Sequence, residues 1–186
     1  MGAFTDIIRE GHPWRTVRRK FYANGIVHHP ERDAYQEFLT GKIANIGCGT
    51  MYLPGATNVD NRQLETYTEK IVRADIICDA CAMPIASGTY DTVICSHVME
   101  HQENLGRFLG EMHRVLKVGG RLIIIVPNLQ YMGERAYFRD PTHILGCTPR
   151  TMNFLAHLYA EEFKVIQFNT LGKRWKFSID LILEKL

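Results

Sequence analysis

Short apolar runs that each end at a glycine or a carboxylate recur along this chain, and this recurrence most constrains its fold. Such runs are typical of buried strands that stop where the chain turns. They cover Lys42–Ile46, Thr57–Asp60, Ala74–Cys78, Asp91–Cys95 and Arg121–Val126. The last run is almost wholly apolar, as is typical of a strand buried on both faces of a parallel sheet.

Helical patterns alternate with these strands. Apolar residues recur at helical spacing from Leu105 to Leu116, and Gly119-Gly120 ends that helix. We expect further helices over Glu31–Thr40, closed by Gly41, and from Thr148-Pro149-Arg150 onward, with Thr148 as the cap. Two closing strands with Gly172 in their turn are expected over Phe163–Phe168 and Phe177–Leu183. The alternation predicts an open α/β sheet with ligands at the carboxyl ends of its strands.

The length of 186 residues suits a single core, so we expect one domain over 41–186 and an accessory flank over 1–40. The flank is basic around Arg15 and Lys20, which favours a solvated surface and leaves open a lid that attracts an anionic substrate. A net charge of +2 makes a nucleic-acid partner unlikely. Five scattered cysteines, and no apolar run of about 20 residues, predict a reduced cytoplasmic protein without a membrane span.

The strand ends carry the candidate ligand residues. Gly47-x-Gly49 allows the backbone to approach a ligand, and Asp60 ends the next strand, where a carboxylate can accept hydrogen bonds from ribose hydroxyls. Tyr52 stands where a dinucleotide site has its third glycine, which disfavours a nicotinamide-dependent oxidoreductase. These features predict a site for a nucleoside without phosphates.

Five motifs in order resemble those of the class I S-adenosylmethionine-dependent methyltransferases. They are Ile46-Gly47-Cys48-Gly49-Thr50, Asn58-Val59-Asp60, Asp79-Ala80-Cys81-Ala82-Met83-Pro84, Tyr90-Asp91-Thr92-Val93-Ile94-Cys95-Ser96 and Arg114-Val115-Leu116-Lys117-Val118-Gly119-Gly120-Arg121-Leu122. The resemblance covers about Lys42 to Pro127. It implies a Rossmann-like sheet in the order 3-2-1-4-5-7-6 with an antiparallel last strand pair, and S-adenosylmethionine as cofactor.

The resemblance also implies roles for single residues. Gly47 and Gly49 would approach the methionine part of the cofactor, Asp60 would bind the ribose, and Asp79 would hold the adenine amino group. Ser96 and His97 would lie beside the sulfonium. The full set expected at the cofactor is Asn45, Gly47, Cys48, Gly49, Asp60, Asn61, Asp79, Ala80, Cys81, Ser96 and His97.

One departure from the family pattern is the short connection between Gly49 and Asp60. A parallel crossover with its helix normally takes at least ~10–12 residues, so we expect the first crossover helix to be shortened or absent. The chain here resembles a compact subgroup, which it also matches at Asp140-Pro141-Thr142-His143 and Thr148-Pro149. Relatives of that kind are associated with cell-surface saccharide pathways, which implies a small or saccharide-like acceptor.

The segment Ser96–His101, SHVMEH, contains the His-x-x-Glu-His pattern of inverted zinc peptidases. Its place after a buried strand disfavours that chemistry. Small-RNA 2′-O-methyltransferases and ubiquinone-pathway O-methyltransferases look similar here, and they hold a divalent cation with Glu-x-x-Glu-His. This chain has His97 at the first position, which favours a softer ion than magnesium.

Three interpretations of this segment therefore stay open: a divalent-metal site that includes His143, a general base at His97 or His143, and a structural role in which Glu100 and His101 cap a helix. A zinc site at Cys78-x-x-Cys81 is disfavoured, because no second pair follows at finger spacing.

The sequence thus predicts an O-methyltransferase with His97, His101 and His143 as candidate catalytic residues and no assigned metal ligand. The alternative is a non-catalytic protein that binds S-adenosylmethionine or S-adenosylhomocysteine. Aromatic side chains that can line an acceptor pocket are Trp14, Tyr131, Tyr137 and Phe138. The oligomeric state is left open.

Overall fold

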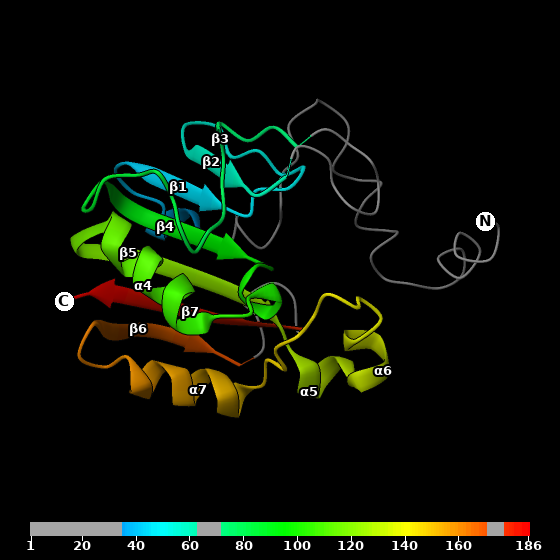
Figure 1. The fold of residues 1–186 in the computed structure, drawn as a ribbon. Coiled ribbons are helices and arrows are strands. Elements are labelled where there is room, and N and C mark those ends of the chain that lie inside the picture. Colours follow the sequence, from blue (N-terminus) through cyan, green and yellow to red (C-terminus); the bar gives the residue numbers. More distant parts are fainter. Residues whose placement is uncertain (1–34, 63–71, 171–176) are drawn as a thin grey trace.

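The computed structural model describes residues 35–62, 72–170 and 177–186. Within these residues one seven-stranded sheet has the order β3-β2-β1-β4-β5-β7-β6 (Figure 1). The strands are β1 (Ile43–Ile46), β2 (Thr57–Asp60), β3 (Ile76–Ile77), β4 (Tyr90–Ser96), β5 (Leu116–Pro127), β6 (Phe163–Asn169) and β7 (Ser178–Lys185). Strands β1 to β5 pair in parallel, and β7 pairs antiparallel with both β5 and β6. The predicted order and the antiparallel last pair are confirmed.

The helices match the predicted pattern only in part. They are the 3-10 turns η1 (Gln36–Phe38) and η2 (Met99–His101) and the helices α4 (Leu105–Val115), α5 (Leu129–Met132), α6 (Glu134–Tyr137) and α7 (Pro149–Leu158). The predicted opening of α7 is confirmed, since Thr148 and Thr151 form a capping box before Pro149. The helix expected over Glu31–Thr40 lies partly outside the described residues, and its described part holds only the short η1. Gly172, expected in the last turn, also lies outside them.

The connection from β1 to β2 contains no helix among its described residues 47–56, as predicted. Buried side-chain amides take the place of helix packing. Asn58 Nδ2 donates to the carbonyls of Leu53 and Ala56 at 3.1 Å, and its Oδ1 accepts from the Leu53 amide at 2.8 Å. Asn45 Nδ2 donates to the same Oδ1 at 2.8 Å. The backbone amide of Asn58 donates to Asp75 Oδ2 at 2.7 Å. These bonds hold β1, β2 and the loop together at the edge of the sheet.

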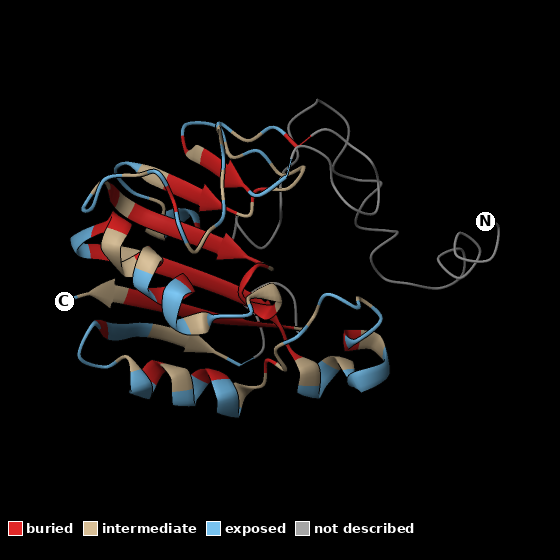
Figure 2. Ribbon diagram, viewed as in Figure 1, coloured by how far each residue is buried: buried red, intermediate tan, exposed pale blue. Residues whose placement is uncertain are grey.

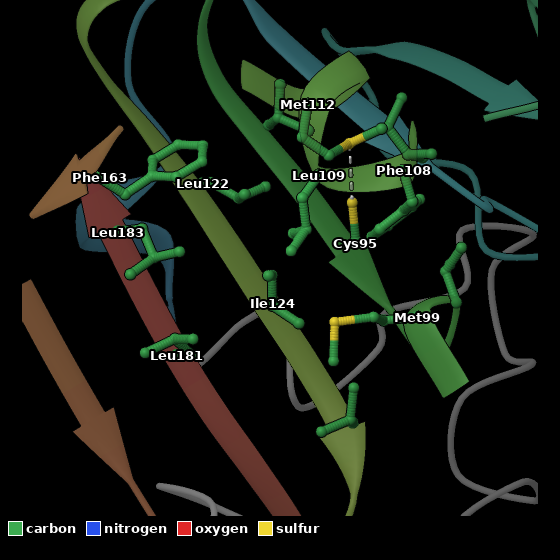
Figure 3. Close-up of a cluster of buried hydrophobic side chains, with 14 of the residues drawn as sticks. Cys95, Met99, Phe108, Leu109, Met112, Leu122, Ile124, Phe163, Leu181 and Leu183 are labelled. Carbon is green, nitrogen blue, oxygen red and sulfur yellow. Dashed lines mark hydrogen bonds between the residues drawn. The ribbon is translucent and has the colours of Figure 1, made fainter. Parts of the chain in front are cut away.

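Two apolar clusters pack against the sheet. Its central strands are buried along most of their length (Figure 2). The larger one joins α4 and α7 to the sheet through Phe108, Met112 and Met152. Figure 3 shows Phe108 and Met112 beside Cys95 of β4. The smaller one packs Tyr35 against Ile94, Ile123, Ile125 and Ile182. Strand β5 contributes to both clusters, so the predicted burial on both faces is confirmed. None of the helices in the described part of the chain is long and apolar enough to span a membrane.

Two predicted boundaries were wrong around β5. The strand begins at Leu116, directly after α4, because Leu116 pairs with Tyr90 before an irregularity in the register. Gly119-Gly120 therefore lies within the strand rather than at the end of the helix, and Gly119 has a φ of +74°. Helices α5 and α6 were not predicted, since each has only four residues.

Candidate active site

The carboxyl ends of β1, β2, β3 and β4 meet at one edge of the sheet (Figure 1). Gly47 follows β1 with a φ of +64°, and a Cβ there would overlap Cγ2 of Val98. Gly49, with a φ of +53°, donates its amide to Asp60 Oδ2 at 2.7 Å. The glycine turn and the carboxylate at the end of β2 are thus joined directly, as neighbours at this edge.

The turn after β3 carries three of the expected cofactor residues. Asp79 Oδ1 accepts from the Cys81 amide at 2.8 Å, and the Asp79 carbonyl accepts from the Ala82 amide at 3.0 Å. Burial, and then the Asp79 charge, raise the pKa of the Cys78 and Cys81 thiols. Both thiols are partly buried against the larger core cluster, where they pack as small apolar groups.

Three further expected cofactor residues already have partners within the protein. Asn45 donates to Asn58 and to the Met51 carbonyl, while its buried Oδ1 accepts no hydrogen bond. Cys48 is fully buried behind the glycine turn. Asn61 is exposed, and its Oδ1 accepts from Arg62 Nε at 3.0 Å. The first two help to shape the edge, so their contact with a cofactor stays a prediction.

The SHVMEH segment does not form an α-helix. His97 has a φ of +56°, and its amide donates to the Ile125 carbonyl of β5 at 2.8 Å. Only Met99–His101 adopt a 3-10 turn. The i, i+4 helical pairing of His97 with His101 that a peptidase motif requires is therefore absent here.

Glu100 is buried, with 0% of its surface exposed, and neither carboxylate oxygen has a hydrogen-bond partner among the described residues. Three histidines surround it. His97 Nδ1 lies 3.3 Å from Oε1, His101 Nε2 lies 3.8 Å away, and His143 Nε2 lies 4.0 Å away. Glu100, His101 and His143, which we call the Glu100 centre, each offer one ligand atom within 4.8 Å of the others. It is the one such cluster in the described part of the chain.

Hydrogen bonds at the opposite ring nitrogens orient both histidines of the centre. His101 Nδ1 lies 3.1 Å from the Thr142 carbonyl, and His143 Nδ1 lies 2.8 Å from the Tyr137 carbonyl. A carbonyl only accepts, so each Nδ1 carries a proton, and whenever the ring is neutral its Nε2 is the unprotonated nitrogen that faces Glu100. Burial lowers the pKa of His143 against the opposing effect of Glu100, which favours this neutral form.

The loop 138–147, which we call the strap, carries His143 to the centre. The amides of Ile144 and Leu145 both donate to the Glu100 carbonyl, at 3.0 and 3.1 Å. The Tyr137 hydroxyl donates to the Leu145 carbonyl at 2.6 Å and accepts from the Cys147 amide at 3.1 Å. Burial raises the pKa of the Cys147 thiol to about 12, so this cysteine stays protonated. The strap is thus fixed to η2 at one point and to α6 at another.

The aromatic residues expected at an acceptor pocket lie in different environments. Tyr137 is fully buried and holds the strap, so it lines no open surface. Tyr131, which precedes Tyr137 in the sequence, is 54% exposed, and Phe138, which follows it, is 48% exposed. Trp14 lies outside the described residues, as does the basic flank. Sequence reasoning missed Thr142, although its place beside His143 in the Asp140–His143 motif was a signal.

The two Nε2-to-Oε1 distances of the Glu100 centre, 3.8 and 4.0 Å, exceed those of hydrogen bonds. If both rings are neutral, two nitrogen lone pairs face the carboxylate. A divalent cation would satisfy all three groups, because imidazole nitrogens and a carboxylate oxygen are a common ligand set for zinc and other transition metals. The donor set fits such an ion. A proton held by one histidine is the other way to balance the charge.

Comparison with known proteins agrees with this architecture. Residues 44–124 match the family model described as a methyltransferase domain. The fold resembles the crystal structure of an S-adenosylmethionine-dependent methyltransferase from Archaeoglobus fulgidus, with a TM-score of 0.62 and 17% identity over 94% of this chain and 100% of that one.

Two curated relatives differ in the atom that their names assign to methylation. A ubiquinone/menaquinone biosynthesis C-methyltransferase of Desulfotalea psychrophila is 31% identical over 75 residues, which are 38% of this chain and 30% of that protein. A ubiquinone biosynthesis O-methyltransferase of Rhodopseudomonas palustris is 21% identical over 91% of this chain and 79% of that protein. The chain spans 30% and 46% of the first two curated relatives that it matches.

Proposed function

We propose that the chain, which has the fold of S-adenosylmethionine-dependent methyltransferase structures and matches a methyltransferase domain over residues 44–124, is a class I methyltransferase that transfers the cofactor's methyl group to a hydroxyl oxygen of a small acceptor. The observation that carries the proposal is the Glu100 centre. It lies directly after β4, where Ser96 and His97 would flank the sulfonium, so a group that can take a hydroxyl proton would stand next to the methyl donor.

Asp60 and Asp79 support the placement of S-adenosylmethionine. Each carboxylate ends a neighbouring strand of the parallel sheet, and Asp60 Oδ2 is fixed by the Gly49 amide. Asp60 would take the ribose hydroxyls and Asp79 the adenine amino group. The methionine part would lie against Gly47, where a Cβ has no room beside Val98.

A divalent cation is the form of the Glu100 centre that we favour over a lone histidine base. A buried carboxylate that accepts no hydrogen bond is costly, and two neutral imidazoles do not relieve that cost. A cation bound here would lower the pKa of an acceptor hydroxyl, so the oxygen attacks as something close to an alkoxide. Glu100, His101 and His143 would hold it. His97, at 3.3 Å from Glu100, would face the acceptor side.

A saccharide-like acceptor fits the surface beside the strap. Tyr131 and Phe138 expose their rings there, and aromatic faces pack on sugar rings. A net charge of +2 does not favour a nucleic-acid acceptor, whose phosphates reward strongly basic surfaces. We propose that 41–186 form the catalytic domain and that 1–40 act as an accessory segment.

The first test is a calorimetric titration of S-adenosylhomocysteine into the purified protein in EDTA, repeated with manganese and with zinc. We expect binding in every condition, with a heat or affinity that changes with the metal. No binding in any condition would refute the assignment. Methyl transfer is then measured as S-adenosylhomocysteine release from S-adenosylmethionine with a panel of sugars and diols.

Histidine variants separate an enzyme from a protein that only binds the cofactor. We expect His143→Ala to lose turnover while it keeps its affinity for S-adenosylhomocysteine. His157→Ala is the matched control, since this exposed histidine of α7 lies outside the Glu100 centre and its Nδ1 is hydrogen-bonded to the Asn153 carbonyl of its own helix. Equal activity of the two variants would exclude a catalytic role for the Glu100 centre.

A further inference from the structure

The Thr142 side chain makes a hydrogen bond outside the strap, to His101 of η2. Its Oγ1 lies 2.9 Å from His101 Nδ1, closer than the Thr142 carbonyl at 3.1 Å. The same Oγ1 lies 2.6 Å from Asp140 Oδ1, which also accepts from the Thr142 amide at 2.9 Å. Thr142 is exposed, so its hydroxyl is not required to satisfy a buried group.

The direction of each bond in this chain of contacts follows from counting protons. A hydroxyl has one proton, and a 2.6 Å contact with a carboxylate is typical of a charge-assisted bond in which the hydroxyl donates. The Thr142 hydroxyl therefore has only lone pairs left for His101. Its partner Nδ1 must carry a proton, and Nε2 of the neutral ring must be the unprotonated nitrogen.

We propose that Asp140 and Thr142 are positioning residues that fix His101 in the Nδ1-protonated form, with its Nε2 directed at Glu100. Asp140 holds the hydroxyl proton away from His101, and Thr142 then accepts from Nδ1. This second layer deepens the proposed function, because it prepares a cation ligand or base without touching cofactor or acceptor. Second-layer partners of this kind fix ring orientation and tautomer in metal sites.

The two histidines of the centre are held by different means. Tyr137 orients His143 through its main-chain carbonyl, which no side-chain substitution removes. His101 is oriented partly by the Thr142 side chain, so only His101 can be tested by substitution at its partner. Thr142 is a cleaner position than Asp140, since Asp140 Oδ2 also lies 4.0 Å from His143 Nε2.

The test compares Thr142→Val, which keeps the shape and removes the hydroxyl, with Thr142→Ser, which keeps the hydroxyl. Long-range ¹⁵N–¹H NMR spectra of the metal-free protein report which ring nitrogen of His101 carries the proton, with the signal assigned from His101→Gln. We expect the Nδ1-protonated form in the wild type and in Thr142→Ser. In Thr142→Val only the weaker contact with the Thr142 carbonyl at 3.1 Å remains, so we expect a measurable fraction of the Nε2-protonated form. A wild-type His101 protonated at Nε2, or a Val variant that keeps a pure Nδ1 form, would overturn the proposal.

A cobalt titration followed by its visible absorption gives the second readout. We expect Thr142→Val to lower the cobalt affinity roughly tenfold, and Thr142→Ser to keep it. Equal cobalt affinity in all three proteins would count against a positioning role. If no protein bound cobalt, the metal form of the proposed function would fail, while the NMR result would still decide the tautomer. Unchanged affinity for S-adenosylhomocysteine and equal melting temperatures show that the variants are folded.

Discussion

Glu100 combines full burial with a negative charge and no hydrogen-bond donor among the described residues. Stability alone does not select such a group, because desolvation of an ion costs several kcal/mol unless a partner compensates. Its nearest ring nitrogens are His97 Nδ1 at 3.3 Å, His101 Nε2 at 3.8 Å and His143 Nε2 at 4.0 Å. A positive charge, from a bound cation or a protonated histidine, would compensate the carboxylate.

Glu100→Gln should raise the stability of the metal-free protein by about 1 kcal/mol or more, because it removes the buried charge. Thermal unfolding in EDTA at pH 8 measures this effect, and added manganese or zinc should no longer shift the transition. A clearly lower melting temperature than that of the wild type would mean that Glu100 is paired with a protonated histidine in the metal-free protein.

Asp60→Asn should weaken the binding of S-adenosylhomocysteine about tenfold or more, because it replaces the charged acceptor that we propose for the ribose hydroxyls with a neutral amide. Calorimetry in EDTA measures this. Asp91→Asn is the control, since Asp91 pairs with Lys117 and accepts from the Lys42 amide near the start of β4. An affinity unchanged in Asp60→Asn would remove this carboxylate from the cofactor site.

Among the elements, the strands that position the cofactor edge could be predicted from their apolar runs and their terminal glycines and acids. Strand β2 has the predicted bounds, and β3 is shorter than predicted because only Ile76 and Ile77 pair with β2. The strap could not be predicted in this way. Its path depends on tertiary contacts of Tyr137 and Glu100, which leave no periodic signal in the sequence.

The connection between β3 and β4 depends on α4 for its anchor. Glu111 accepts from the Met83 amide at 2.9 Å and from Arg114 Nη2 at 2.8 Å, and Arg114 donates to the Met83 and Ile85 carbonyls. The hydrogen bond from Arg114 lowers the pKa of Glu111 below its ordinary value of 4.5. This pair therefore stabilises the fold in the ionised form.

Glu111→Gln should lower the free energy of unfolding at pH 7 by about 1–2 kcal/mol. Because the folded-state pKa is lowered, the stabilisation is present above about pH 4.5 and is lost as the pH falls through the folded value. Urea unfolding at pH 7 and near pH 3 checks this, and the difference between the proteins should vanish at the lower pH. Glu103→Gln, on the exposed turn before α4, is the control. A difference that persists at pH 3 would point to lost packing instead.

For the whole molecule, the Glu100 centre joins two segments that the sheet separates. His101 follows β4, and His143 follows β5 and α6. The hydrogen bond between His101 and Thr142 joins residues that are 41 positions apart in the sequence. The sequence suggested that His143 could fold over the same site, and the structure places it there. The sequence could not show that the cluster of possible metal ligands would be Glu100, His101 and His143, without His97. The position of the His97 ring depends on its positive φ at the end of β4, which leaves no signal in the sequence.

A cation at this centre should stabilise the whole fold, because the unfolded chain holds no such site. At a concentration 100 times its dissociation constant the gain is about 2.7 kcal/mol, or roughly 5–10 °C in melting temperature for a chain of this size. Scanning calorimetry with manganese or zinc against EDTA measures the shift. His143→Ala should abolish it and His157→Ala should retain it. An equal shift in both variants would place the ion elsewhere.

The amide of Asn58 acts as a template for the length of the loop before it. The Asn58 side chain accepts from the Leu53 backbone amide and donates to the carbonyls of Leu53 and Ala56. These hydrogen bonds fix the distance between residues 53 and 56. Surface loops generally tolerate insertions, but an extra residue between 53 and 56 would break this match. We therefore expect the turn to vary in its side chains and not in its number of residues.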